Sequence, residues 1–381
     1  MKPLGRKTQV MRFHKNILAI AFLIALGTIG GLACTETQYV KTSEGEVAEP
    51  ILAVNHVCAW PNNLTVLEDG TIIANIFNKP SHAWIEGDVD CWASTDEGRT
   101  WVKRGTVAPA EPNTVRAWAA TGLTNNGDLI AICGGLSNDY PPGKTGRPFR
   151  ASVLRPWICY SKDGGRNWTI DKKTFPEKSP DGGTQWPYGQ IVRGNNGTLY
   201  ASVYSSKNDQ TPEETHRMYI YKSQDDGKTW GDPVCMDMNN QLDETSLLHL
   251  GGGHWLAAAR FHGLHLYQSD DDGETWQFMK RLTGDYKHPG HLLKLSDGSL
   301  VLTYGNRKKG EYGVEVRRSY DRGNTWTEPI RVVDLSHRDS GHPSSVQLAD
   351  GRILTAYYGP KIGYHVTYHM GVVIWDPEKS F

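Results

Sequence analysis

The chain has 381 residues, with 42 acidic and 41 basic side chains and a net charge of -1. This balance argues against a protein that binds nucleic acid through a basic surface. Charged residues make up 22% and hydrophobic residues 38% of the chain, which also contains 41 glycines and 13 tryptophans. The composition excludes collagen, coiled coil and wholesale disorder, so we expect a folded globular protein.

The first 34 residues are predicted to be a targeting segment. A basic start precedes an apolar run over residues 17–29, which has the length of a signal-peptide core and is short for a membrane span. The run ends in Gly31-Leu32-Ala33-Cys34, which resembles a bacterial lipoprotein signal with a lipidated cysteine. We expect a bacterial cell-surface or periplasmic lipoprotein, or otherwise a secreted protein, with residues 35–50 as a flexible linker. The lipid on Cys34 is the only membrane contact we expect.

The remaining cysteines and the histidine pairs predict neither a disulfide framework nor a cofactor site. An odd number of cysteines without a C-x-x-C pair leaves at least one thiol unpaired, and most are expected to be small buried residues. The pairs His262/His265 and His288/His291 are spaced three apart, which places the two side chains of each pair on opposite faces of a strand. We therefore expect no metal and no organic cofactor.

A repeated motif, S-x-D-x-G-x-T/N-W, dominates the rest of the chain. It occurs five times, at residues 94–101, 161–168, 223–230, 269–276 and 319–326. In each copy the aspartate can accept backbone N–H bonds across a tight turn, the glycine allows a positive φ, and the tryptophan covers the turn. We interpret these aspartates as structural residues of a repeating scaffold.

Six predicted β-hairpins alternate with these turns. Their turns are Asp69-Gly70, Asn126-Gly127, Asn196-Gly197, Gly252-Gly253, Asp297-Gly298 and Asp350-Gly351. A third strand usually follows each hairpin and leads into the aspartate turn, and a short fourth strand follows that. Six units of four strands predict an all-β fold, a six-bladed β-propeller of four-stranded antiparallel blades over residues 51–381, with residues 51–57 pairing with the last blade.

The repeated turns resemble the Asp boxes (BNR repeats) of the sialidase (neuraminidase) superfamily, over roughly residues 51–377. Sialidases hold the substrate carboxylate with three arginines and use a tyrosine nucleophile paired with a glutamate, together with an aspartate acid/base. The segment ETSLLHLGGGHWLAAAR resembles the one that carries the glutamate and the second arginine, which implies Glu244 and Arg260. LTYGNR implies another arginine of the three at Arg307.

Two positions depart from the family pattern. The first arginine of the family lies in an Arg-Ile-Pro motif, but this chain has Ala59-Trp60-Pro61 at that place. The family also has a tyrosine in the sixth blade, where this chain has Gly341-His342-Pro343-Ser344. Arg116 could supply a third guanidinium from a new direction. These departures argue against ordinary sialidase activity.

The candidate residues for the funnel come from the ends of the inner hairpins. The catalytic candidates are His342, Glu244, Asp88, Asp90, Tyr188 and His82. The substrate-binding candidates are Arg116, Arg260, Arg307, Trp60, Asn63, Trp186 and His288. Aromatic faces beside arginine, asparagine and acidic groups are typical of sugar-binding sites, although the aromatic residues could pack between blades and the arginines could form scaffold ion pairs.

Three functions remain open at this point, and each takes an oligosaccharide or polysaccharide as the partner. The first is an exo-acting glycoside hydrolase on acidic or capped extracellular glycans, with Asp88 or Asp90 as the acid, Glu244 as base or nucleophile partner, and an arginine clamp. The second is a lyase or dehydratase that eliminates across a uronic acid, with histidine and tyrosine as acid and base. The third is a surface propeller that binds glycans without catalysis.

Overall fold

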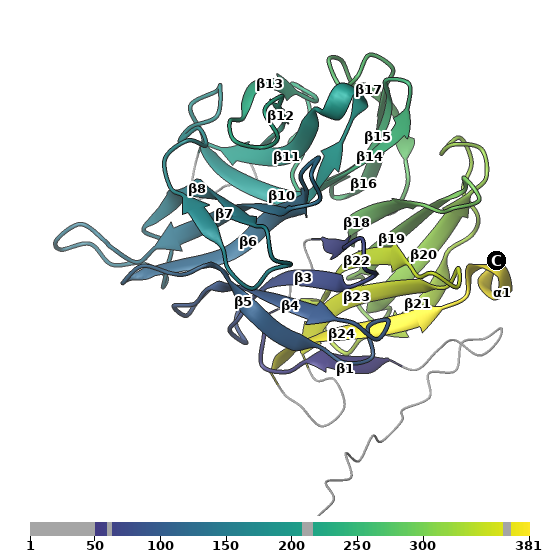
Figure 1. Cartoon of the computed structure of the whole chain (residues 1–381), viewed down its shortest axis with the longest axis horizontal. Coiled ribbons are helices and arrows are strands. Elements are labelled where there is room, and N and C mark those ends of the chain that lie inside the picture. Colours follow the sequence, from purple (N-terminus) through teal and green to yellow (C-terminus); the bar gives the residue numbers. More distant parts are fainter. Residues whose placement is uncertain (1–49, 59–62, 208–215, 361–366) are drawn as a thin grey trace, which may run out of the picture. The chain divides into compact units, whose positions relative to one another are not determined.

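The computed structural model describes residues 50–58, 63–207, 216–360 and 367–381. In these residues the secondary structure is almost entirely β (Figure 1), apart from a 3-10 turn, η1 (Asn195–Gly197), and a short helix, α1 (Pro377–Ser380). No helix in this part of the chain is long and apolar enough to cross a membrane. The predicted targeting segment with Cys34, nearly all of the predicted linker and Trp60 lie outside the described residues.

Four sheets of the described chain have four strands each. The first contains β2 (Leu64–Val66), β3 (Ile72–Phe77), β4 (Val89–Ser94) and β5 (Val102–Ala108). The next contains β14 (Thr245–Gly251), β15 (His254–Phe261), β16 (Gly263–Ser269) and β17 (Gln277–Arg281). The third contains β18 (Lys287–Lys294), β19 (Leu300–Asn306), β20 (Gly313–Ser319) and β21 (Ile330–Asp334). The last contains β22 (Gly341–Gln347), β23 (Ile353–Pro360), β24 (Tyr368–Trp375) and β1 (Ile51–Val54).

The remaining sheet has eight strands, which corrects the expectation of six separate blades. One half contains β6 (Thr114–Leu123), β7 (Leu129–Ser137), β8 (Ser152–Ser161) and β9 (Thr169–Asp171). The other half contains β10 (Thr184–Arg193), β11 (Leu199–Ser206), β12 (Arg217–Ser223) and β13 (Gly231–Cys235). The halves are joined by parallel pairing of β6 and β10, from Gly189↔Ala120 to Ile191↔Gly122. Glycine permits this approach, because a Cβ at Gly122 would collide with the Ile191 carbonyl oxygen.

The first strands of the six four-strand groups lie next to one another in chain order. β2 contacts β6, β6 contacts β10, and the series continues through β14 and β18 to β22, which contacts β2. The N-terminal strand β1 pairs with β24 of the last group, with Ile51 opposite Val372. Figure 1 shows β6, β10, β14, β18 and β22 following one another around the centre of the view. This arrangement is consistent with the predicted propeller.

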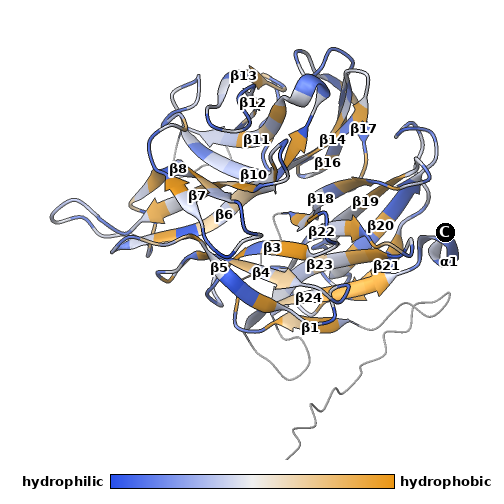
Figure 2. Ribbon diagram, viewed as in Figure 1, coloured by the Kyte–Doolittle hydropathy of each residue, from blue (hydrophilic) through white to orange (hydrophobic). Residues whose placement is uncertain are grey.

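The hydrophobic core lies between the sheets, and the polar residues lie mainly in the connections (Figure 2). The repeated turns close the outer hairpins. In the first, the Gly98 amide donates to Ser94 Oγ at 2.8 Å, and the Thr100 amide donates to Asp96 Oδ1 at 2.9 Å. Trp101 Nε1 donates to the Gly98 carbonyl oxygen at 2.9 Å, and Gly98 has a φ of 84°. The aspartate oxygens are therefore occupied within their own turn, as the structural interpretation requires.

Candidate functional site

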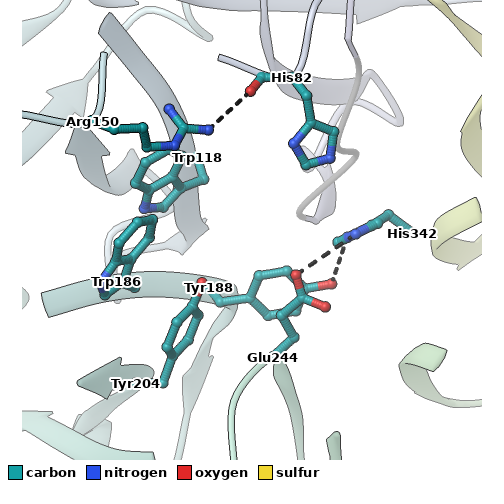
Figure 3. A pocket seen from close by; sticks show the side chains of 8 residues that line it. All are labelled: His82, Trp118, Arg150, Trp186, Tyr188, Tyr204, Glu244 and His342. Atoms are coloured by element: carbon teal, nitrogen blue, oxygen red, sulfur yellow. Dashed lines mark hydrogen bonds and ion pairs between the residues drawn. The ribbon is translucent and has the colours of Figure 1, made fainter. Parts of the chain in front are cut away.

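A pocket of about 140 Å³ lies where several inner strands begin or end (Figure 3). It is lined by His82, Trp118, Arg150, Trp186, Tyr188, Tyr204, Glu244 and His342. Five of these residues were candidates from the sequence: His82, Trp186, Tyr188, Glu244 and His342. The fold therefore brings together side chains from the β3–β4 connection, from β10 and from the starts of β14 and β22.

Tyr188, His342 and Glu244 form a connected group on one side of the pocket. The Tyr188 hydroxyl lies 3.2 Å from His342 Nδ1, and His342 Nε2 lies 3.7 Å from Glu244 Oε1. His342 has a φ of 44°, in the left-handed region that residues with a side chain rarely adopt. Strained backbone of this kind is common at functional sites, and here it helps to aim the imidazole at both partners.

Both members of the tyrosine–histidine pair are held neutral by their surroundings. Burial, and then the Glu244 carboxylate, raise the pKa of the Tyr188 phenol well above its ordinary value. Burial, and then the positive charge of Arg307, hold the pKa of His342 well below its ordinary value. In these neutral states the phenol can donate a hydrogen bond to Nδ1 of the imidazole.

Arg260, on β15, ties the acidic residues of this region together. Its Nη1 donates to Glu244 Oε2 at 2.7 Å, and its Nε lies 3.5 Å from Asp243 Oδ1. His216 Nδ1 lies 3.2 Å from the other Asp243 oxygen. Burial lowers the pKa of Arg260, but the two carboxylates raise it by more, so the guanidinium stays charged.

Arg307 and His288 lie near this group but do not line the pocket. Arg307 Nε donates to the Ser340 carbonyl oxygen at 3.1 Å, and its Nη2 has no hydrogen-bond partner among the described residues. His288 is buried, and its Nδ1 also has no partner in the described chain. Burial, and then the Arg260 and Arg307 cations, lower the pKa of His288, so it is neutral.

His82 approaches the pocket from the opposite side, in the β3–β4 connection (Figure 3). Its Nε2 lies 3.4 Å from Asp339 Oδ1. Asp339 also accepts hydrogen bonds from the hydroxyls of Tyr358 and Tyr368. Burial acts to raise the pKa of Asp339, but the hydrogen bonds from His82 and the two phenols outweigh burial and hold this pKa well below its ordinary value. An ionised, fixed carboxylate therefore orients the His82 ring.

Three stacked aromatic rings form a wall of the pocket. The ring centroids of Trp118 and Trp186 lie 4.7 Å apart with 12° between the planes, and those of Trp186 and Tyr204 lie 5.8 Å apart with 11°. Stacked faces of this kind suit the CH face of a sugar ring. Trp186 was a sequence candidate, whereas Tyr204, at the end of β11, was not.

Arg150 is a pocket residue that the sequence analysis did not identify. It lies near the end of the long β7–β8 connection, and its guanidinium donates to the carbonyl oxygens of Ala83 at 3.1 Å and His82 at 3.3 Å. Asp339 was also missed. Neither residue belongs to a repeat, but Asp339 stands three positions before His342, and that proximity was an available signal.

Three other sequence candidates lie in structural contacts away from the pocket. Asp88 accepts from the Ala110 amide at 2.7 Å, and Asp90 pairs with Lys103 Nζ at 2.8 Å. Arg116 is buried within its own sheet, with its guanidinium carbon 3.5 Å from the centre of the Trp157 ring. None of the three lines the pocket, so they do not form a carboxylate pair or an arginine clamp with the pocket residues.

Asn63 belongs to a buried polar network between the inner strands. Its side-chain amide donates to the Thr121 carbonyl oxygen at 3.1 Å, and its Oδ1 lies 3.4 Å from His291 Nε2. His291 Nε2 also lies 2.9 Å from the side-chain amide of Gln190. Burial lowers the pKa of His291 to about 4. These contacts connect three of the inner strands and do not reach the pocket lining.

The chain matches known proteins over much of its length. Residues 60–288 match the model of the BNR repeat-like domain. A sialidase of Clostridium perfringens is 27% identical over 208 residues, which cover 50% of this chain and 52% of the relative. The chain thus spans about half the length of that curated relative.

Solved structures share the fold at low identity. A Dyadobacter fermentans protein of unknown function has a TM-score of 0.72 at 20% identity, covering 87% of this chain and 98% of that one. The NanB sialidase of Streptococcus pneumoniae has a TM-score of 0.65 at 10% identity, covering 87% and 71%. A Trypanosoma rangeli sialidase, in complex with 2,3-difluorosialic acid as a covalent intermediate, has a TM-score of 0.62 at 15% identity, covering 91% and 57%. The chain belongs to the BNR repeat-like domain family of the sialidase superfamily, because its repeated turns, its matched domain and its fold all agree with that family.

Proposed function

We propose that this protein is a glycoside hydrolase that removes an acidic sugar from a glycan bound in the pocket. The observation that carries the proposal is the contact of the Tyr188 hydroxyl with His342 Nδ1, with the second nitrogen of His342 facing Glu244. The phenol that the family pattern places in the sixth unit is missing there. In this chain β10 supplies a phenol to the same pocket. Membership of the sialidase superfamily supports the same class of reaction.

The proposed reaction has two displacements. The Tyr188 oxygen attacks the anomeric carbon while His342 takes the phenol proton, and Glu244 stabilises the resulting imidazolium. His82, oriented by Asp339, donates a proton to the departing glycosidic oxygen. A water molecule, deprotonated by the then neutral His82, releases the sugar from Tyr188, which recovers its proton from His342. A neutral phenol suits an acidic sugar, because its approach is not repelled by the substrate carboxylate.

The substrate carboxylate is assigned to the arginines near the pocket. Arg307 Nη2 has no hydrogen-bond partner in the described chain, and Arg150 lines the pocket. Arg260 is already shared between Glu244 and Asp243, so it mainly holds the glutamate in place. Because Arg116 lies against Trp157, we assign it no part in this clamp.

A second reaction is supported by one specific observation. Glu244 is the only carboxylate among the residues lining the described pocket, since Asp88 and Asp90 lie elsewhere. A single carboxylate beside a histidine and a tyrosine also suits elimination across a uronic acid. There an arginine would neutralise the substrate carboxylate, His342 or Tyr188 would remove the neighbouring C–H proton, and His82 would protonate the leaving oxygen.

One experiment separates these reactions. The purified protein is incubated with sialylated glycans and uronic-acid oligomers, and the products are followed by mass and ultraviolet absorbance. Hydrolysis adds one water across the cleaved bond without new absorbance, whereas elimination creates a conjugated double bond that absorbs. Binding without either product would overturn both proposals and favour a glycan-binding propeller without catalysis.

We propose that the six four-strand groups close into one six-bladed ring, which the contact between β2 and β22 supports.

We also propose that the protein is exported and lipidated at Cys34. Mass spectrometry of the protein purified from a bacterial membrane fraction tests this directly, because a lipidated Cys34 would be the N-terminal residue.

A further inference from the structure

A short segment at the edge of the pocket exposes two large apolar side chains. Trp84 is 39% exposed and Ile85 is 48% exposed, and both follow His82, which faces the pocket. Most large aromatic side chains of the described chain are buried. Two adjacent exposed apolar side chains beside a candidate catalytic group point to a ligand-binding surface.

The Trp84 ring is covered on one face by Arg150. The Arg150 guanidinium carbon lies 4.8 Å from the ring centroid, which is a cation–π contact. The same guanidinium donates to the carbonyl oxygens of His82 and Ala83, and Arg150 also lines the pocket. Arg150 thus connects the pocket with the exposed indole through a set of fixed contacts.

The backbone around Trp84 is held in one conformation. Ala83 is fully buried and has a φ of 56°, and the Trp84 amide donates to Ser81 Oγ at 3.3 Å. Glu86 accepts from the Asn113 amide at 3.1 Å, which ties the end of the segment to the start of the next sheet. The indole is therefore pre-organised. A ligand that stacks on it loses little binding free energy to the ordering of this loop.

We propose that Trp84, backed by Arg150, is a second sugar-binding subsite that holds the sugar next to the one in the pocket. This proposal rests on the proposed function. An indole that rests on a guanidinium and is 39% exposed can stack on the CH face of a pyranose ring. His82 is the proposed proton donor to the leaving glycosidic oxygen, and Trp84 follows it by two residues. We therefore assign the subsite to the sugar on the leaving-group side of the cleaved bond. The enzyme would then prefer oligosaccharides to single acidic sugars.

The test measures binding with catalysis removed. In the Tyr188→Phe background, calorimetry compares N-acetylneuraminate with sialyllactose, and galacturonate with its tetramer. For whichever pair binds, we expect the longer sugar to bind more tightly. Trp84→Ala should reduce this advantage about 10-fold, while affinity for the single sugar stays within about twofold. Trp84→Tyr should retain most of the advantage, since a smaller ring can still stack.

The matched control is Tyr320→Ala. Tyr320 is 65% exposed and lies 4.8 Å from the Arg318 guanidinium carbon, but it belongs to one of the repeated turns and does not line the pocket. It should leave both affinities unchanged. Equal affinity for the short and long sugars, or an equal loss for both in Trp84→Ala, would overturn the subsite and leave the proposed function standing. Failure of the starting protein to bind any of the four sugars would overturn both.

Discussion

The repeated turns and the pocket both depend on carboxylates, but the two regions position them differently. In the fourth turn, the Asp271 carboxylate is held by Ser269 and Thr275, all within a few residues of one another. Glu244 in the pocket is held by Arg260 of the same sheet and faces His342 of another. The turn is a local structure that a short sequence can specify, whereas the pocket exists only when distant strands have assembled.

The largest effect should come from Tyr188→Phe. Removing the hydroxyl leaves the ring packing but removes the proposed nucleophile, so kcat should fall at least about 10⁴-fold on the substrate identified by the product screen. Tyr221→Phe is the matched control, because this buried phenol has no hydrogen-bond partner for its hydroxyl in the described chain. Equal activity in both variants would remove Tyr188 from the mechanism.

Arg260→Met should damage both stability and activity. It leaves the Glu244 and Asp243 carboxylates without their shared cation, and with the arginine side chain 28% exposed we expect the free energy of unfolding to fall by about 2–3 kcal/mol. Affinity for acidic glycans should fall as well, because Glu244 and its neighbours lose their fixed positions. Denaturant unfolding and glycan binding check the two effects. An unchanged midpoint and slope would show that the network is not stabilising.

The buried histidines should make the fold sensitive to acid. The pKa of His291 is about 4 when folded, against about 6.5 for an unfolded histidine, so the unfolded chain binds more protons between these values. The free energy of unfolding should therefore fall as the pH falls through this window, by at most about 3.4 kcal/mol from His291. His291→Gln should reduce the slope of this free energy against pH. The same slope in the starting protein and in His291→Gln would contradict the assignment.

The pH dependence of activity follows from the lowered pKa of His342. A general base must be neutral, and this histidine stays neutral below the pH at which an ordinary histidine becomes charged. The loss of kcat on the acidic side should therefore begin below a pH of about 6.5. An acidic limb at or above that pH, measured from initial rates, would assign the base to another group.

The smallest effect should come from breaking one repeated turn. Asp271→Ala removes the acceptor for the Ser269 hydroxyl and the Thr275 amide, at 2.8 and 2.9 Å. The free energy of unfolding should fall by about 1–2 kcal/mol, and kcat should stay unchanged. A loss of activity without a loss of stability would show that these aspartates do more than hold turns.

The same contrast explains what the sequence could predict. The turns and hairpins follow from short motifs, and five pocket residues followed from strand ends or family motifs. Arg150 could not be found this way, because it lies within a long connection without a repeat. Its contact with His82 joins residues 68 positions apart, which no local pattern encodes. Asp88, Asp90 and Arg116 also sit near strand ends, but partners within or next to their own sheets hold them elsewhere. Whether a side chain near the end of a strand faces the pocket depends on how it packs, and its position in the sequence does not determine this.

The parallel pairing between β6 and β10 has a consequence for how the protein opens. Elsewhere adjacent groups of strands are separate sheets, whereas these two share backbone hydrogen bonds. The amides of the eight-stranded sheet should therefore exchange with deuterium as one cooperative unit, more slowly than those of the separate sheets. Tyr188 and Trp186 both lie on β10, inside this unit. The proposed nucleophile, the Tyr188 phenol, is thus placed in the part of the fold that is expected to open last.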